Sequence, residues 1–532
     1  MPRALRIAAV VTMAMLASAC GGSSEGAQQS PAAPVPAPAE PAPTLAERVE
    51  VDNVAVLQGT TATILDDGVV KKKRNAPVIA GRPGIVRVHA RALDSRARLP
   101  KLAAELRIAT PGKEDVVVRT EPRSLVERDD ADLDTTFNFD LAADALTATS
   151  TLSVALEDPA APGDRASFPN DGSTFLLDAR DDAPTLRIRF VPVRYDQDGS
   201  GRLPKLDAAS LEAHRRALYA MYPARNVVVD VREALPWANA VEARGKGWDQ
   251  LLDAIVDTRH SDAVDDDVYY VGVFTPKSSI NEYCGDGGCI LGVAPAAQLE
   301  EVGLRVAMVV GYETYGANGT LAQELAHAMG REHAPCGDPD GPDESYPYAG
   351  ARIGVAGWHI LDKKLVDPGG RSRDFMSYCG PVWISDYTFN GLYDRMVDVA
   401  KSKRAGKGGG PTSTGGGPGA GGAATARLRS YHVTEDGSLS EGALVDVVAQ
   451  NGVAQSGVKS GITMHYEDAT GRTIAVADAA YRRFDSLRSG LLLAAEPPKG
   501  AVRARVEGLA VRPLELNVSL SARARESVRA PR

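Results

Sequence analysis

The segment from Gln323 to His333 reads QELAHAMGREH and carries the most specific pattern of polar residues in the chain. Gln323 and His327 lie four residues apart, so a helix would place both side chains on one face. Glu324 would lie beside that face, within reach of a water molecule held by a metal ion there. Gly330 would let the helix end and the chain turn sharply, which would bring His333 round to the same point. The pattern therefore predicts a helix that ends at a metal site.

A second short segment, residues 372–379, supports this interpretation. It reads SRDFMSYC and contains Met376 and Tyr378. Together the two segments resemble the metzincin zinc peptidases, whose HExxHxxGxxH motif is followed by a turn that carries a methionine. The match holds at every fixed position of the motif except the first, where Gln323 stands in place of a histidine. The resemblance covers about residues 184–403, although only the two short segments carry it.

This resemblance implies an α/β catalytic domain that hydrolyses peptide bonds. It implies that His327 and His333 bind zinc and that Met376 forms an apolar floor under the metal. The zinc would polarise the scissile carbonyl group and lower the pKa of its water. Glu324 would take the proton of that water and pass it to the leaving amine. Tyr378 would stabilise the negatively charged oxygen of the tetrahedral intermediate.

The residue at position 323 leaves the implied zinc site with two good ligands rather than three. An amide oxygen is neutral and a weaker donor to zinc than imidazole, so the affinity for metal should fall. Three outcomes are open. The amide oxygen of Gln323, together with Tyr378, completes a weak zinc site; another residue takes its place, His359 being the nearest spare histidine in the sequence; or the site is empty and the domain is a pseudoenzyme.

Four cysteines follow the N-terminal segment, and an even number in an exported chain suggests two disulfides. Residue spacing alone leaves three pairings open. The resemblance implies the pair Cys336–Cys379, because in that family the loops that carry them meet beneath the metal. Cys284–Cys289 would then close a small loop just before residues 290–293. The resemblance identifies those residues as the edge strand that binds an extended substrate by strand addition.

The first twenty residues have the three-part form of a secretory signal, with an apolar run that is too short to span a bilayer. The small residues before Cys20 resemble the lipobox of bacterial lipoproteins. This resemblance implies a lipid anchor at Cys20 and attachment to the cell envelope, at an outer membrane or the cell surface. The alternative is an ordinary signal peptide with an incidental cysteine. Residues 21–46 are rich in Gly, Ser, Ala and Pro, which predicts a disordered tether.

The rest of the chain predicts a multidomain protein in which an α/β domain is flanked by two β domains. Residues 47–182 contain short alternating apolar segments, which are typical of a β-sandwich. Residues 184–403 alternate between strands and helices. A Gly-rich linker follows at residues 405–425. Residues 426–522 return to alternating segments, which predicts a small β-sandwich-like domain.

The charge of the chain limits its partners, and two acidic segments offer a second kind of metal site. The formal net charge of −9 argues against general nucleic-acid binding, which needs a basic face. Residues 196–207 resemble a calcium loop, but the strand before them and Pro204 favour a polar turn leading into a helix. A second acidic cluster, which is more simply explained as a solvated loop, follows the zinc motif and comprises Asp338, Asp340, Asp343 and Glu344.

Two functions are compatible with these features. The first is an exported, surface-tethered zinc metallopeptidase that cleaves extracellular proteins or glycoproteins, and the intact Glu324 favours it. The second is a catalytically inactive homologue that binds protein or glycan through its cleft or its β domains. The replacement of the first motif histidine by Gln323 favours this second function. Proteolysis that a chelator and a Glu324→Ala substitution both abolish would separate the two.

Overall fold

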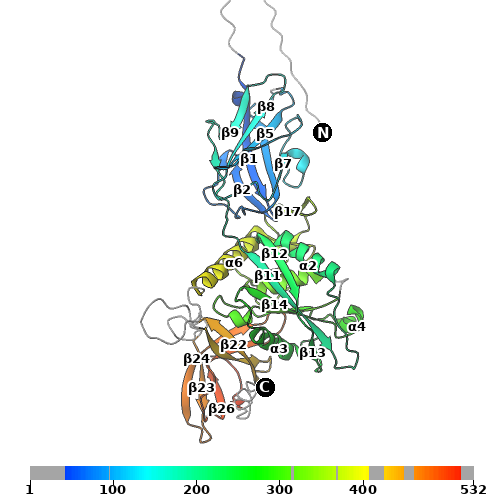
Figure 1. Cartoon of the computed structure of the whole chain (residues 1–532), viewed down its shortest axis with the longest axis vertical. Coiled ribbons are helices and arrows are strands. Elements are labelled where there is room, and N and C mark those ends of the chain that lie inside the picture. The colour runs from blue at the N-terminus through cyan, green and yellow to red at the C-terminus, as the bar shows by residue number, and fades with distance from the viewer. Residues whose placement is uncertain are drawn as a thin grey trace, which may run out of the picture. The chain divides into compact units, whose positions relative to one another are not determined.

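The computed structural model describes residues 42–516, apart from residues 95, 97, 313–316, 367–369, 407–424 and 449–460. The predicted signal peptide, Cys20 and most of the tether lie outside the described residues, as do most of the Gly-rich linker and the end of the last predicted domain. Within the described residues the protein is multidomain and consists mostly of β-sheet, as predicted (Figure 1). No described helix combines the length and the hydropathy that crossing a membrane would require.

Two antiparallel sheets form the N-terminal region. Their elements are α1 (Leu45–Arg48), β1 (Val49–Leu57), β2 (Thr61–Asp66), β3 (Val69–Val70), β4 (Gly84–Ala92), β5 (Ala103–Ala109), β6 (Val116–Arg119), β7 (Phe137–Leu141), β8 (Thr151–Glu157), β9 (Arg165–Phe168) and β10 (Phe175–Leu176). The first sheet has the order β3-β2-β1-β4-β7, and the second has the order β10-β8-β5-β6 with β9 beside β8. Alternate residues of β8 are buried, as expected of a strand with one face against a core. Both sheets contribute to one hydrophobic core, so the predicted β-rich region is confirmed.

The central region contains a mostly parallel sheet with helices on both faces. Its elements are β11 (Thr185–Tyr195), α2 (Ala208–Met221), β12 (Asn226–Val231), β13 (Leu235–Trp237), α3 (Trp248–Ser261), β14 (Val268–Phe274), α4 (Ile280–Cys284), β15 (Gly292–Val293), β16 (Val306–Val310), α5 (Ala317–His327), β17 (Gly357–His359), β18 (Lys364–Val366), β19 (Arg373–Asp374), β20 (Val382–Trp383) and α6 (Asp386–Gly406). The sheet order is β12-β11-β14-β16-β15, and β13 also pairs with β11. The strands β12, β11, β14 and β16 are parallel, and β15 is antiparallel at the edge. The predicted edge strand at residues 290–293 is therefore found at residues 292–293.

The two faces of this sheet belong to different cores. Strands β14 and β16 are buried along their whole length, as parallel strands between two helical layers are. Val271 packs with residues of α2 and α5 in one core. Its neighbour Tyr270 points to the opposite face and packs with residues of α3 in the other. The helix that carries the candidate site, α5, is thus held against one face of the sheet.

An antiparallel sheet forms the C-terminal region. It comprises β21 (Thr425–Val433), β22 (Leu439–Val448), β23 (Ile462–Glu467), β24 (Thr473–Arg483), β25 (Gly490–Ala494), β26 (Arg503–Glu507) and β27 (Leu514–Glu515), in the order β22-β21-β25-β24-β23-β26-β27. One group of its side chains, including Met464 and Tyr466, forms a core of its own. Another group, including Val445 and Leu491, packs with Trp248 of α3 in the core described above. The C-terminal sheet therefore shares a core with the central region.

Polar side chains also join the C-terminal sheet to the central region. Arg482 forms an ion pair with Glu301 at 2.6 Å, and both side chains are buried. His432 pairs with Asp253 of α3 at 2.6 Å. A buried ion pair requires both partners to stay in place, because separating them would leave a charge without compensation. The C-terminal sheet is accordingly a fixed part of the structure that surrounds the site.

Candidate metal centre

The predicted helix and its sharp end are both present. Helix α5 ends at His327, the first histidine of the motif. The chain then turns at Gly330, whose φ of +79° is in the left-handed region that favours glycine. The amide of Gly330 donates to the carbonyl oxygen of His327 at 2.7 Å. This turn brings His333 back to His327, and the centroids of the two rings lie 4.6 Å apart.

Both histidines are oriented as metal ligands are. Each is almost fully buried, with exposed fractions of 2% for His327 and 1% for His333. The Nδ1 atom of His327 lies 2.7 Å from the carbonyl oxygen of Arg331, and that of His333 lies 2.9 Å from the carbonyl oxygen of Asp340. Because a carbonyl oxygen only accepts, each Nδ1 carries a hydrogen, and in the neutral form of each ring the lone pair is then on Nε2. Neither Nε2 has a hydrogen-bond partner among the described residues.

A carboxylate from the C-terminal region completes the group. Asp485 lies in the loop between β24 and β25, and its Oδ2 is 3.8 Å from Nε2 of His327. The amide of Ala294, just after β15, donates to Oδ1 of Asp485 at 2.9 Å. One ligand atom from each of His327, His333 and Asp485 lies within 4.8 Å of the other two. Among the described residues this is the group that could hold a metal ion, and sequence analysis did not include Asp485.

Glu324 points into the same buried space. Its exposed fraction is 2%, and its Oε2 has no hydrogen-bond partner among the described residues. Burial, together with the negative charge of Asp485, raises the pKa of Glu324 well above its ordinary value in the metal-free site. Burial also lowers the pKa of His327 to about 4, which keeps its imidazole neutral. The site therefore combines the imidazoles of His327 and His333 with the carboxyl groups of Asp485 and Glu324.

Gln323 and His359 are the two residues that the sequence suggested as a third metal ligand. The Nε2 of Gln323 is buried and has no hydrogen-bond partner among the described residues. His359 lies in β17, where its ring packs against Trp383 at 5.4 Å and its Nδ1 accepts from the amide of Asp362. His359 is therefore outside the group that could hold a metal, and its suggested role as the replacement ligand is wrong. Asp485, which a distant loop brings beside His327, is the third member of that group.

The segment with Met376 lies against the turn that carries His333. The amide of Ala334 donates to the carbonyl oxygen of Met376 at 3.0 Å, and the Met376 side chain is buried. The ring of Tyr378 contacts the ring of His333 at a centroid distance of 4.8 Å, although Tyr378 is 46% exposed. Partial burial raises the pKa of Tyr378 above its ordinary value, so its hydroxyl group remains protonated at neutral pH.

Both predicted disulfides are present. Cys336–Cys379 joins the segment after His333 to the segment after Met376, and Cys284–Cys289 closes the loop before β15. The long bridge is the one that holds two parts of the candidate site together.

Removal of the long bridge is expected to destabilise the protein more than removal of the short one. The sequence separations are 43 and 5 residues. The chain-entropy model then gives about 4 kcal/mol for Cys336→Ser with Cys379→Ser and about 2 kcal/mol for Cys284→Ser with Cys289→Ser. Denaturant unfolding of both double variants in the presence of a chelator measures the difference. An equal or larger loss from the short bridge would contradict this expectation.

The acidic segments have structural roles. Asp198 pairs with Arg202, and Asp207 caps α2 by accepting from the amide of Ser210 at 2.9 Å. This arrangement agrees with the polar turn favoured for residues 196–207. In the second segment, Asp343 accepts a hydrogen bond from the hydroxyl of Tyr387 at 2.7 Å, and the backbone of Asp340 orients His333 as described above. The calcium suggestion therefore gains no support from either segment.

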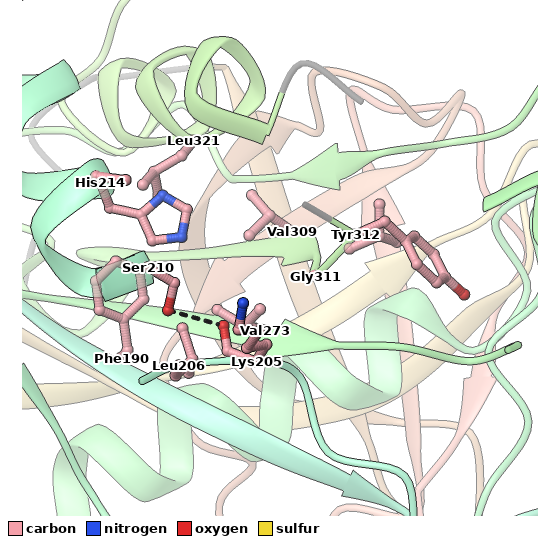
Figure 2. Close-up of a pocket in the computed structure, with 12 residues that line it drawn as sticks. Phe190, Lys205, Leu206, Ser210, His214, Val273, Val309, Gly311, Tyr312 and Leu321 are labelled. Carbon is pink, nitrogen blue, oxygen red and sulfur yellow. Dashed lines mark hydrogen bonds between the residues drawn. The ribbon is translucent and has the colours of Figure 1, made fainter. Parts of the chain in front are cut away.

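A small apolar cavity lies near the site but apart from it. It has a volume of about 140 Å³ and lies between α2, the central sheet and the start of α5. Figure 2 shows Phe190, Val273 and Leu321 around it, and the hydroxyl of Ser210 donates to the carbonyl oxygen of Lys205 at its rim. The residues that line it include none of the metal group or Glu324, so the cavity is not part of the metal centre.

The chain matches no model of a known protein family, and no curated protein matches it either. The functional argument therefore rests on the residues of the site and their geometry.

Proposed function

We propose that the protein is an exported, metal-dependent peptide hydrolase of the metzincin type. The observation that carries this proposal is the pair of buried imidazoles of His327 and His333, whose Nε2 lone pairs are free beside the buried carboxyl group of Glu324. Leaving these buried polar atoms without partners is costly unless something else satisfies them. Two oriented imidazoles with a carboxylate are a donor set that suits zinc. The residues present therefore fit a zinc ion.

The chain's own residues have defined tasks in this proposal. A zinc ion in such a site acts as a Lewis acid on the substrate carbonyl and lowers the pKa of water. Glu324 accepts the proton of the attacking water and delivers it to the leaving amine, because it is the buried carboxyl group on the helix that ends at His327. Tyr378, held beside His333, donates a hydrogen bond to the oxygen that becomes negative. The edge strand β15 positions an extended peptide.

The substrate class follows from the proposed location. The two disulfides are typical of a protein that resides outside the cytoplasm. With the signal segment and a lipid anchor at Cys20, the protein would be held at the bacterial envelope by its Pro- and Ala-rich tether. Its substrates would then be extracellular proteins or glycoproteins.

One observation favours the second candidate function, a surface module that binds without catalysis. Phe484 forms an antiparallel bridge with Pro295, directly after the edge strand. Asp485 accepts from the amide of Ala294 in the same place. The C-terminal region thus occupies part of the edge that an extended substrate would use.

Proteolysis of an unfolded protein such as reduced casein tests the proposed function. The full-length protein, purified without chelator, is expected to cleave casein, to lose this activity after dialysis against a strong chelator, and to regain it when zinc is restored. A zinc-loaded protein that leaves casein and denatured glycoproteins intact would rule out the hydrolase and leave the binding module.

A further inference from the structure

We infer that Asp485 is the third protein ligand of the metal centre and that Gln323 is not a ligand. The inference concerns metal binding alone and rests on the proposed function only in that both require a metal at this site. It makes the C-terminal sheet an obligatory part of the centre.

The charge of the site supports this assignment. Asp485 is buried, and among the described residues its ion-pair partner is His327 alone. The Nδ1 of that imidazole donates to the carbonyl oxygen of Arg331 at 2.7 Å, so Nε2 is the ring nitrogen that faces the carboxylate. Burying a carboxylate without a cation costs desolvation free energy, so such groups are normally paired with a cation or bound to a metal. A divalent cation between the two Nε2 atoms and Asp485 would supply the missing charge.

The donor set supports it as well. Two imidazoles with one carboxylate form an established three-ligand set for catalytic zinc, whereas a neutral amide oxygen is a poor donor. Asp485 is oriented by the amide of Ala294 at 2.9 Å and by the hydroxyl of Ser486 at 2.6 Å. Metal ligands are usually held by such outer contacts. The histidine that the motif has at the position of Gln323 is thus replaced by a charged ligand from another part of the chain.

Buried contacts on both sides of the loop hold Asp485 in place. Asp485 lies three residues beyond Arg482, whose buried ion pair with Glu301 fixes the end of β24. Leu491 and Leu493 of β25, on the other side of the loop, pack in the core that contains α3. A removable inhibitory segment would have to break these contacts to leave. The geometry therefore favours Asp485 as a metal ligand over a removable inhibitory segment.

Zinc affinity of the full-length protein, measured by competition with a chromophoric chelator, tests the assignment. Asp485→Asn keeps the size of the side chain and its acceptor for Ala294 but removes its charge. We expect it to lower zinc affinity by at least about 100-fold, since loss of an outer contact alone costs roughly 10–100-fold. Gln323→Ala should leave the affinity unchanged within the error of the titration. Arg488→Ala, an exposed change in the same loop, is the matched control.

Two further measurements keep the result interpretable. Adding Gln323→His to Asp485→Asn should restore zinc binding, because a third strong ligand would return from the helix. Cobalt(II) in place of zinc should give a visible spectrum that changes in Asp485→Asn and stays the same in Gln323→Ala. Thermal unfolding of each metal-free variant shows whether it is folded.

The outcomes that overturn the assignment are specific. Loss of zinc from Gln323→Ala with retention in Asp485→Asn would make Gln323 the ligand. If Asp485→Asn retains zinc and gains proteolytic activity, Asp485 is not a ligand and instead blocks a coordination position of the metal that would otherwise be open. A wild-type protein that binds zinc through Asp485 but cleaves no protein would refute the proposed function and leave this assignment intact.

Discussion

Replacement of Glu324 by glutamine is expected to lower proteolysis by about two to four orders of magnitude, the usual contribution of a general acid–base group. Glutamine has nearly the size of glutamate but cannot accept the proton of the attacking water. Glu324 is almost fully buried, and its Oε2 has no other partner among the described residues. The loss should therefore appear in kcat/KM for a fluorescent casein substrate, while the zinc content stays at the wild-type value.

The control for this experiment is Glu332→Gln in the same segment. Glu332 is exposed, so its neutralisation should leave both activity and zinc content as they are. Undiminished proteolysis in Glu324→Gln would show that another group moves the proton, and the mechanism proposed above would have to be abandoned. Parallel loss of zinc and activity would instead show that Glu324 supports the metal rather than the proton transfer.

Breaking the buried ion pair between Arg482 and Glu301 is expected to have a large effect on stability. Glu301→Gln removes the charge that faces the buried guanidinium group of Arg482, and removing one partner of a buried ion pair typically costs about 3–5 kcal/mol. The loop with Asp485 follows directly after this pair, so zinc affinity should fall as well. Denaturant unfolding of the metal-free protein and chelator competition measure the two effects separately.

A compensated variant distinguishes a lost charge balance from a general packing defect. Replacing both partners together, with Arg482→Met and Glu301→Leu, removes the two charges and keeps an apolar contact. Such replacements are often neutral or stabilising, so most of the lost stability should return. If the double variant is as unstable as Glu301→Gln, the pair does not hold the C-terminal sheet through its charges.

Local patterns predicted the parts of the site that are close in sequence. The spacing of His327, Gly330 and His333 gave the helix end and the turn, because helix geometry and a left-handed glycine are local properties. The cysteine pairs followed from the resemblance, and both are present. The alternation of strands and helices also indicated the layered central region, although the parallel order of its strands is visible only in the structure.

The part that sequence analysis missed depends on contacts between distant segments. Asp485 stands in a short polar stretch between two apolar strands, where an aspartate ordinarily marks a surface turn. Its place beside His327 requires that β24 and β25 pack against the central region, and no spacing rule reports such packing. The same reasoning explains the error with His359, which is nearer to the motif in sequence but lies against Trp383. Proximity along the chain was a poor guide to the residue that lies beside His327 and His333.

The packing of the C-terminal sheet against α3 also has a consequence for the timing of maturation. On the assignment of Asp485, the motif with His327 and His333 leaves the ribosome well before its third ligand is synthesised. The centre can then be completed only after strands β24 and β25 have folded onto the core they share with α3. A chain truncated before these strands would carry the motif without a finished metal site.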